Sequence, residues 1–228
     1  MSETKPIRIA IYDMDRTVTV RGTYTPFLLH VARAIAPWRV LLVPLVLLAM
    51  LAYVLRLVPR KQLKEFNQRV MMGGRVRRDR LAPLIESYAD TVMQTNIRQG
   101  ALERIAHDRA EGYRLVLATA SYRLYVEAIA RRAGFDDVIA TDHLGQDMDY
   151  VRAKIAGDNC YDIAKLAMIR EWMAQQGIDR EQAYIRAYSD HVSDAPMLDF
   201  ADEGYAANPH KPLAKIASMR GWKRFDWR

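Results

Sequence analysis

Two aspartates two residues apart stand directly after a short apolar run near the start of the sequence, in AIYDMDRTVT (residues 10–19). Asp13 and Asp15 would share one face of a strand, and a turn beginning at Met14 would aim both side chains into one crevice. Two neighbouring carboxylates can serve as a nucleophile and as a general acid and base, provided that a cation screens their repulsion. The pattern alone is equally typical of a turn or a helix N-cap, so its meaning depends on the rest of the chain.

Three later segments carry residues of matching chemistry. Thr119 ends the apolar run LVLAT just before a predicted helix, where a hydroxyl and free backbone N–H groups can hold a phosphate oxygen. Lys165 lies beside the apolar side of another predicted helix, so its ammonium must either reach solvent or find a buried anion. Asp190 and Asp194 follow a further apolar strand, and carboxylates so placed are suitable ligands for magnesium.

The segments that would position these residues alternate between strand and helix patterns. IRIAIY is a short apolar run ahead of Asp13, and after Gly100 apolar strands alternate with helical patterns of about 10 to 15 residues. This rhythm predicts an α/β fold with a doubly wound parallel sheet covered by helices on both faces. Such sheets bind ligands at the carboxyl ends of their strands, where Asp13 lies. Ser121 is expected to cap the next helix, and residues 145–157 are expected to be irregular.

Residues 21–96 interrupt this rhythm with an apolar and basic segment. We expect residues 1–20 and 97–228 to form the α/β core and residues 21–96 to form an inserted α-helical cap. The whole chain has a net charge of +7, and the stretch from Arg21 to Gln99 holds 13 Lys/Arg against 4 Asp/Glu. This basic field would attract phosphorylated substrates or anionic lipid. Aromatic residues are too sparse there to favour single-stranded nucleic-acid binding, so no nucleic-acid partner is expected.

The four motifs, in this order along the chain, resemble those of the haloacid dehalogenase (HAD) superfamily, in particular the branch that includes phosphoserine phosphatase. DMDRT resembles the first motif, LATAS the second, Lys165 the third and SDHVSD the fourth. The resemblance covers residues 5–20 and 97–228, and it implies a HAD-type core with an inserted helical cap. Arg16 and Ser189 depart from the pattern, because glycine is usual at both positions.

This resemblance implies a magnesium-dependent phosphatase that works through an aspartyl-phosphate. Asp13 would be the nucleophile, and Asp15 would protonate the leaving group and then deprotonate the attacking water. Thr119 and Lys165 would hold the phosphoryl oxygens. The implied ligands of Mg²⁺ are Asp13, the Asp15 carbonyl and Asp190, with Asp194 in support.

The stretch from Val40 to Leu55 has 16 residues without a charge, which is about 24 Å of helix against a hydrocarbon thickness of roughly 30 Å. A single crossing would separate Asp13 from the later site residues, which lie on the other side of this stretch in the sequence. We therefore expect a re-entrant or interfacial hairpin in contact with the membrane, and the buried core of a soluble cap is the alternative. The residues suited to a headgroup zone are Trp38, Tyr53, Arg39, Arg56, Arg60, Lys61 and Lys64.

An apolar, basic cap over a phosphatase site favours a lipid-linked phosphate such as phosphatidylglycerophosphate. The absence of an apolar leader before the first strand then predicts a protein at the cytoplasmic face of the cell membrane. The alternative substrate is a small soluble metabolite such as phosphoserine. A non-catalytic membrane adaptor is the least favoured interpretation, because every reacting residue is present. We expect His191 to have a surface or packing role and Cys160, the single cysteine, to be a small buried hydrophobe.

Overall fold

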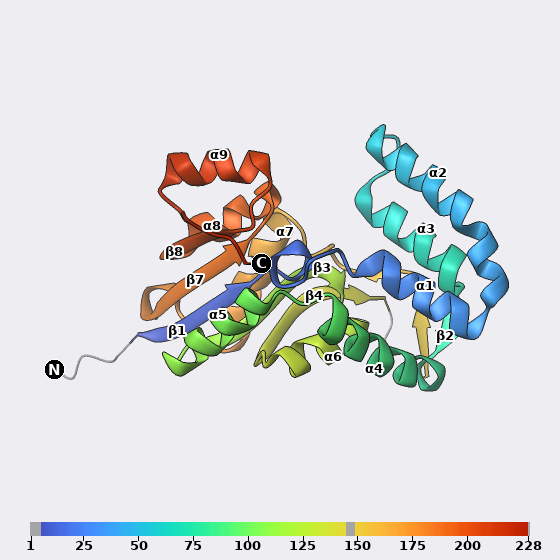
Figure 1. Cartoon of the computed structure of the whole chain (residues 1–228), viewed down its shortest axis with the longest axis horizontal. Helices are drawn as coiled ribbons and strands as arrows, with labels where there is room; N and C mark the ends of the chain where they lie inside the picture. Colours follow the sequence, from blue (N-terminus) through green and yellow to red (C-terminus); the bar gives the residue numbers. More distant parts are fainter. Residues whose placement is uncertain (1–5, 145–148, 228) are drawn as a thin grey trace.

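A mostly parallel sheet forms the centre of the molecule (Figure 1), seen in a computed structural model that describes residues 6–144 and 149–227. Its strand order is β6-β4-β3-β1-β7-β8-β9, and neighbouring strands are parallel except for the antiparallel pair β4 and β6. The predicted doubly wound α/β fold is therefore confirmed. The strands of this sheet are β1 (Ile7–Tyr12), β3 (Arg114–Tyr122), β4 (Asp137–His143), β6 (Ile155–Ala156), β7 (Ala183–Ser189), β8 (Glu203–Ala207) and β9 (Lys223–Phe225).

The alternation of side chains along β1 explains why helices cover both faces of the sheet. Ile9 and Ile11 are buried in one cluster with residues of α7, α8 and α9, whereas Ala10 and Tyr12 are buried in a second cluster with residues of α5 and α6. Successive side chains of a strand point to opposite faces, so a strand whose residues 9–12 are all buried needs cover on each side. These helices are α5 (Gln99–Ala110), α6 (Arg123–Ala133), α7 (Ile163–Gln175), α8 (Ala195–Phe200) and α9 (Lys211–Arg220).

The residues expected to form the cap are mostly helical. Helices α1, α2 and α3 lie together at one end of the molecule, and α4 runs along α6 of the core (Figure 1). The chain enters and leaves this region side by side, since Thr19 forms a β-bridge with Ile97. These positions are consistent with an insert at residues 21–96, whose boundaries stay a prediction. The elements are α1 (Tyr24–Ile35), a 3-10 helix η2 (Pro37–Leu42), α2 (Val43–Val54), α3 (Arg60–Met72), β2 (Arg75–Arg77) and α4 (Arg78–Thr95).

One expectation from the sequence is wrong between residues 149 and 157, which we predicted to be irregular. There β5 (Tyr150–Arg152) pairs antiparallel with β2 of the cap, and β6 pairs with β4. Both strands are too short to show an alternating pattern, and the partner of β5 is remote in sequence. The rest of the expected irregular stretch, residues 145–148, lies outside the described residues.

The helical stretch Pro37–Val54 is long and apolar enough to cross a membrane, and 6% of it is buried within the protein. Leu47, Leu48 and Leu51 are 59%, 61% and 53% exposed. The alternative of a soluble cap required these leucines to form its buried core, and the structure does not bury them.

Helix α3 attaches the cap to the core through polar side chains. The Nζ of Lys64 lies 2.6 Å from the Ala120 carbonyl oxygen and 2.8 Å from Asn159 Oδ1. The next residue, Glu65, accepts a hydrogen bond of 3.0 Å from the Ile155 N–H. Lys64 and Glu65 are buried and their partners Ala120 and Asn159 partly buried, so an opening of the cap would expose donors and acceptors that are now paired.

The buried amine of Lys64 makes a testable contribution to stability. Burial lowers its pKa from 10.5 to about 7, and a neutral amine can still donate to both oxygens. Because the folded pKa lies below the unfolded one, the unfolded chain binds more protons between these two values, and this contribution makes the free energy of unfolding rise with pH across that window.

Replacement Lys64→Met should remove this dependence, and denaturant unfolding of both proteins at several pH values between 7 and 10.5 measures it. A difference between wild type and variant that does not change with pH would contradict the assignment.

Candidate active site

The end of β1 delivers Asp13 to the edge of the sheet. The Asp13 N–H donates to the Tyr188 carbonyl oxygen at 2.9 Å and so extends the pairing of β1 with β7. The chain then turns through η1 (Met14–Val18), where Arg16 has φ of 69° and its N–H donates to Thr19 Oγ1. This left-handed conformation accounts for the glycine that is usual here, and arginine adopts it at a cost of about 1 kcal/mol.

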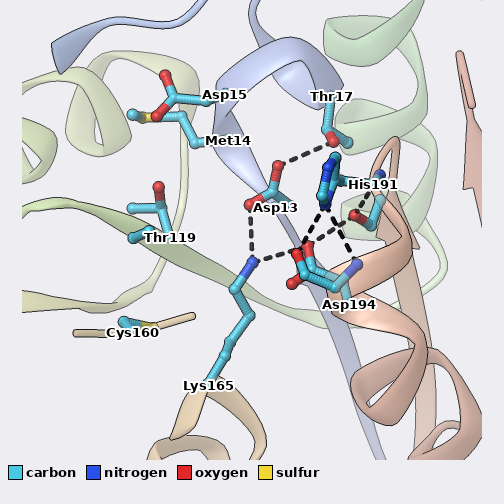
Figure 2. Close-up of polar contacts among 12 residues, drawn as sticks. Asp13, Met14, Asp15, Thr17, Thr119, Cys160, Lys165, His191 and Asp194 are labelled. Carbon is cyan, nitrogen blue, oxygen red and sulfur yellow. Dashed lines mark hydrogen bonds and ion pairs between the residues drawn. The ribbon is translucent and has the colours of Figure 1, made fainter. Parts of the chain in front are cut away.

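A buried ion-pair cluster lies below this turn (Figure 2). Lys165 Nζ is 2.8 Å from Asp13 Oδ1 and 2.8 Å from Asp194 Oδ2, and the lysine is 2% exposed. The sequence left two possibilities for the ammonium of Lys165, contact with solvent or contact with a buried anion. The structure shows the second. Burial alone would lower the pKa of Lys165, but the two carboxylates outweigh it and hold that pKa above its ordinary value.

The carboxylates of this cluster repel one another. Burial, together with Asp194 and Asp190, raises the pKa of Asp13 to about 7 although Lys165 opposes the shift. Burial and Asp194 likewise raise the pKa of Asp190 to about 6. The cluster thus combines the carboxylates of Asp13, Asp190 and Asp194 with the one ammonium of Lys165. When all three acids are ionised it carries an excess of negative charge, which a proton or a metal cation can balance.

Thr17 links two of these acids. Its hydroxyl donates to Asp13 Oδ2 at 3.0 Å and accepts from the Asp190 N–H at 3.0 Å. The residue belongs to the DMDRT segment, but its local sequence predicts no particular role for it, because threonine in a turn can serve many functions. Its contacts show that it fixes the orientation of Asp13 relative to the end of β7.

Asp15 points away from the ion-pair cluster (Figure 2). Its carboxylate accepts hydrogen bonds from the Thr23 N–H at 2.7 Å, the Thr23 hydroxyl at 2.8 Å and the Ser121 hydroxyl at 2.6 Å. Ser121 was expected to cap α6, and that expectation is wrong: Tyr122 occupies the N-cap, and Ser121 holds Asp15 instead. Thr119 lies next to this contact and accepts from the Ser121 N–H at 3.1 Å.

The fourth motif is arranged by two side chains at the end of β7. Ser189, where glycine is usual, donates to Asp194 Oδ2 at 2.7 Å. The ring of His191 stacks on the ring of His210 with centroids 4.3 Å apart. His191 also lines the cavity described below, so the surface or packing role expected from the sequence stays a prediction. Cys160 is fully buried, and burial raises the pKa of its thiol to about 12, so it is no nucleophile at neutral pH.

A cavity of about 580 Å³ unites these residues. Both Asp13 and Asp15 line it, so the expectation that one crevice takes both side chains agrees with the geometry, and Thr119, Lys165, Asp190 and Asp194 line it too. The sequence did not indicate the cap residues that complete its wall, since nothing local marks them. The lining residues that the sequence reasoning missed are Arg16, Gly22, Tyr24, Thr25, Met50, Tyr53, Arg60, Ala120, Tyr161 and Ser193.

The donor set of the cavity fits a hard divalent cation. Asp194 Oδ1 is buried and has no hydrogen-bond partner within residues 6–144 and 149–227, and carboxylate and carbonyl oxygens are the ligands that Mg²⁺ prefers. A second acidic group, His107, Asp108 and Glu111, has ligand atoms within 4.8 Å of one another. There Asp108 already accepts from Tyr12, Tyr188 and Arg186, which leaves a metal little room.

Proteins named as phosphatases are among those similar to this chain. A probable phosphatase of Mycobacterium tuberculosis is 36% identical over 122 residues, which are 54% of this chain and 41% of that protein. A phosphoserine phosphatase of the same organism is 27% identical over 149 residues, which are 65% of this chain and 47% of that protein. The chain thus spans less than half of the length of these relatives.

A crystal structure of a protein with unknown function from Bordetella pertussis Tohama I superposes with a TM-score of 0.86. It is 26% identical and covers 99% of this chain and 100% of its own. Residues 10–199 match the profile of the haloacid dehalogenase-like hydrolases. That match includes all four motifs and the residues gathered around the cavity, and the chain therefore belongs to the haloacid dehalogenase-like hydrolase family.

Proposed function

We propose that this protein is a Mg²⁺-dependent phosphomonoester hydrolase with Asp13 as its nucleophile. The observation that carries the proposal is the position of Asp13, whose two oxygens are held by Lys165 and Thr17 at the end of β1. Asp15 lines the same cavity but is held apart by Thr23 and Ser121. One carboxylate is thus fixed to meet a phosphorus atom, and a second one is free of the ion-pair cluster for proton transfer.

The reaction would proceed in two displacements. A carboxylate oxygen of Asp13 attacks phosphorus, the bond to the leaving oxygen breaks, and Asp15 gives that oxygen its proton. Asp15 then takes a proton from water, which attacks the aspartyl-phosphate and releases inorganic phosphate with Asp13 regenerated. Throughout, Thr119 and Lys165 would hold the phosphoryl oxygens, since both line the cavity.

The residues proposed to hold Mg²⁺ are Asp13, the Asp15 carbonyl and Asp190, with Asp194 in support. When bound, the cation would screen the negative charge of the carboxylates and of the phosphoryl group so that the two can approach.

Two substrate classes fit the cavity. The similarity to a phosphoserine phosphatase favours a small soluble phosphomonoester. This class was the alternative substrate in the interpretation of the sequence. The second candidate is a lipid-linked phosphate, which was the first expectation from the sequence. It is kept because Met50 and Tyr53 of α2 line the cavity, while the leucines of the same helix are exposed. The lipid alternative would place the enzyme at the cytoplasmic face of the membrane.

A panel of purified substrates distinguishes these classes. Phosphoserine, an aryl phosphate and a lipid phosphate in mixed micelles would be compared by kcat/KM. A preference for phosphoserine supports the soluble class, and a preference for the micellar substrate supports the lipid class. No turnover of any phosphomonoester would contradict the proposal and favour a non-catalytic adaptor.

Substitution Asp13→Asn should leave the fold intact and reduce phosphate release by at least about 10³-fold, because an amide of similar size cannot act as the nucleophile. Steady-state hydrolysis of an aryl phosphate measures this, with thermal unfolding as the control for folding. Turnover near that of the wild type would exclude Asp13 as the nucleophile.

Substitution Asp15→Asn should slow alkyl phosphates more than aryl phosphates. Poor leaving groups need a proton in the transition state, and general acid catalysis contributes about 10² to 10⁴ in rate. The ratio of kcat/KM for the two substrate types in variant and wild type is the readout. Equal losses for both types would count against Asp15 as the acid.

Binding of Mg²⁺ should weaken as the pH falls below about 7, because protons compete for Asp13 and Asp190, whose pKa values are raised to about 7 and about 6. Calorimetry at two pH values measures both the affinity and the protons released. Asp190→Asn should weaken binding more than Asp194→Asn. An affinity independent of pH, or turnover that survives thorough chelation, would contradict the proposed site.

A further inference from the structure

We propose that the outer surface of the cap helix α2 docks the protein onto an anionic lipid bilayer. This α2 surface consists of the apolar side chains that η2, α2 and the turn after it expose to solvent. They are Trp38, Leu41, Leu45, Leu47, Leu48, Leu51, Val54, Leu55 and Leu57.

The α2 surface carries few polar groups on its side chains. From Val40 to Leu55 the hydroxyl of Tyr53 is the one polar group on a side chain. A protein partner forms roughly one hydrogen bond for every 100–200 Å² of contact and surrounds its apolar centre with a polar rim. Bilayer hydrocarbon needs no such partners, so a surface of this composition fits lipid better than protein.

The charged residues before and after α2 in the sequence have one sign. From Arg21 to Lys64 the chain contains no acidic residue, and Glu65 is the first. Six cations in this stretch remain outside every ion pair among the described residues, so their charge is available to lipid headgroups. They are Arg21, Arg33, Arg39, Arg56, Arg60 and Lys61.

The way α2 is held favours docking over crossing. Helix α2 packs against α3, and α3 is attached to the core through Lys64 and Glu65. Before α2, Arg39 donates to the carbonyl oxygens of Arg69 and Val70 on α3. Both ends of the apolar stretch are therefore attached to one side of the molecule, and α2 forms the outer edge of the cap (Figure 1). Such a helix can lie in the interface with its apolar face in the acyl region.

Docking in this orientation would bring the catalytic cavity to the membrane. Met50 and Tyr53 line that cavity, and Tyr53 also borders a hollow of about 540 Å³ formed by residues 53–59. A substrate that enters from the bilayer would pass the end of α2 and meet Arg60 at the cavity wall. This last step rests on the proposed function, whereas docking itself does not.

Flotation with vesicles tests the proposal. Wild-type protein should float with phosphatidylcholine vesicles that contain phosphatidylglycerol, bind more as the anionic fraction rises, and bind less in high salt. The triple variant Leu47→Ser/Leu48→Ser/Leu51→Ser should lose at least about tenfold in vesicle affinity, since each leucine would leave the acyl region. Arg33→Gln/Arg56→Gln should reduce binding to anionic vesicles alone.

Matched controls separate docking from a general surface effect. Met219→Ser removes an equally exposed apolar side chain on α9, and Lys215→Gln/Lys223→Gln removes two exposed cations from the same end of the chain. Both controls should bind vesicles as the wild type does. Hydrolysis of a soluble aryl phosphate should be unchanged in all four variants, which tests the proposed function separately from docking.

Failure of the wild type to float, or undiminished flotation of the triple variant, would overturn the proposal. The same holds if sedimentation shows a wild-type dimer that the leucine substitutions dissociate, because a second copy would then cover the surface.

Discussion

The ammonium of Lys165 is almost completely buried between Asp13 and Asp194, 2.8 Å from an oxygen of each. Loss of either partner would leave a charge in a medium that solvates it poorly, which typically costs about 3–5 kcal/mol. The contact joins three elements that are remote in sequence, namely the end of β1, the first turn of α7 and the start of α8. Asp190 adds a further negative charge to this cluster, and the excess of carboxylates favours the binding of a cation. The groups that stabilise this edge of the sheet are therefore also the groups proposed to bind the metal.

The sequence predicted the core well because its information there is local. A short apolar strand that ends in acids predicts a sheet edge, and helices of typical length predict the cover of both faces, as found for β1 and α5 to α9. The contact between Ser121 and Asp15 joins residues 106 positions apart, and nothing near Ser121 distinguishes it from a helix cap. The pairing of β2 with β5 was missed for a similar reason. For α2, composition indicated an apolar helix, but only the three-dimensional structure shows that its leucines lack cover.

Two helices of the cap, α2 and α3, depart from the usual distribution of polar and apolar residues. Toward the core, α3 buries Lys64, Glu65, Asn67 and Gln68, whereas α2 exposes leucines on the opposite side. Globular proteins normally bury leucine and expose lysine and glutamate. The polar contacts hold the cap over the end of β3, which carries Thr119, whereas the apolar side chains of the α2 surface remain largely exposed. We infer that the two sides of the cap have different tasks, one in closing the cavity and one in binding a surface outside the protein.

If Asp13 carries the phosphoryl group during turnover, an aspartyl-phosphate must form at that residue, and its detection is the decisive experiment. In the Asp15→Asn variant the water step should be slower than phosphoryl transfer from an aryl phosphate, so the aspartyl-phosphate should accumulate. Rapid quenching followed by borohydride reduction converts an acyl phosphate into an alcohol, and peptide mass spectrometry locates the change. If the aspartyl-phosphate forms, reduction should convert Asp13 into homoserine. An unmodified Asp13 after a burst of released aryl alcohol, or a modified residue elsewhere, would contradict it.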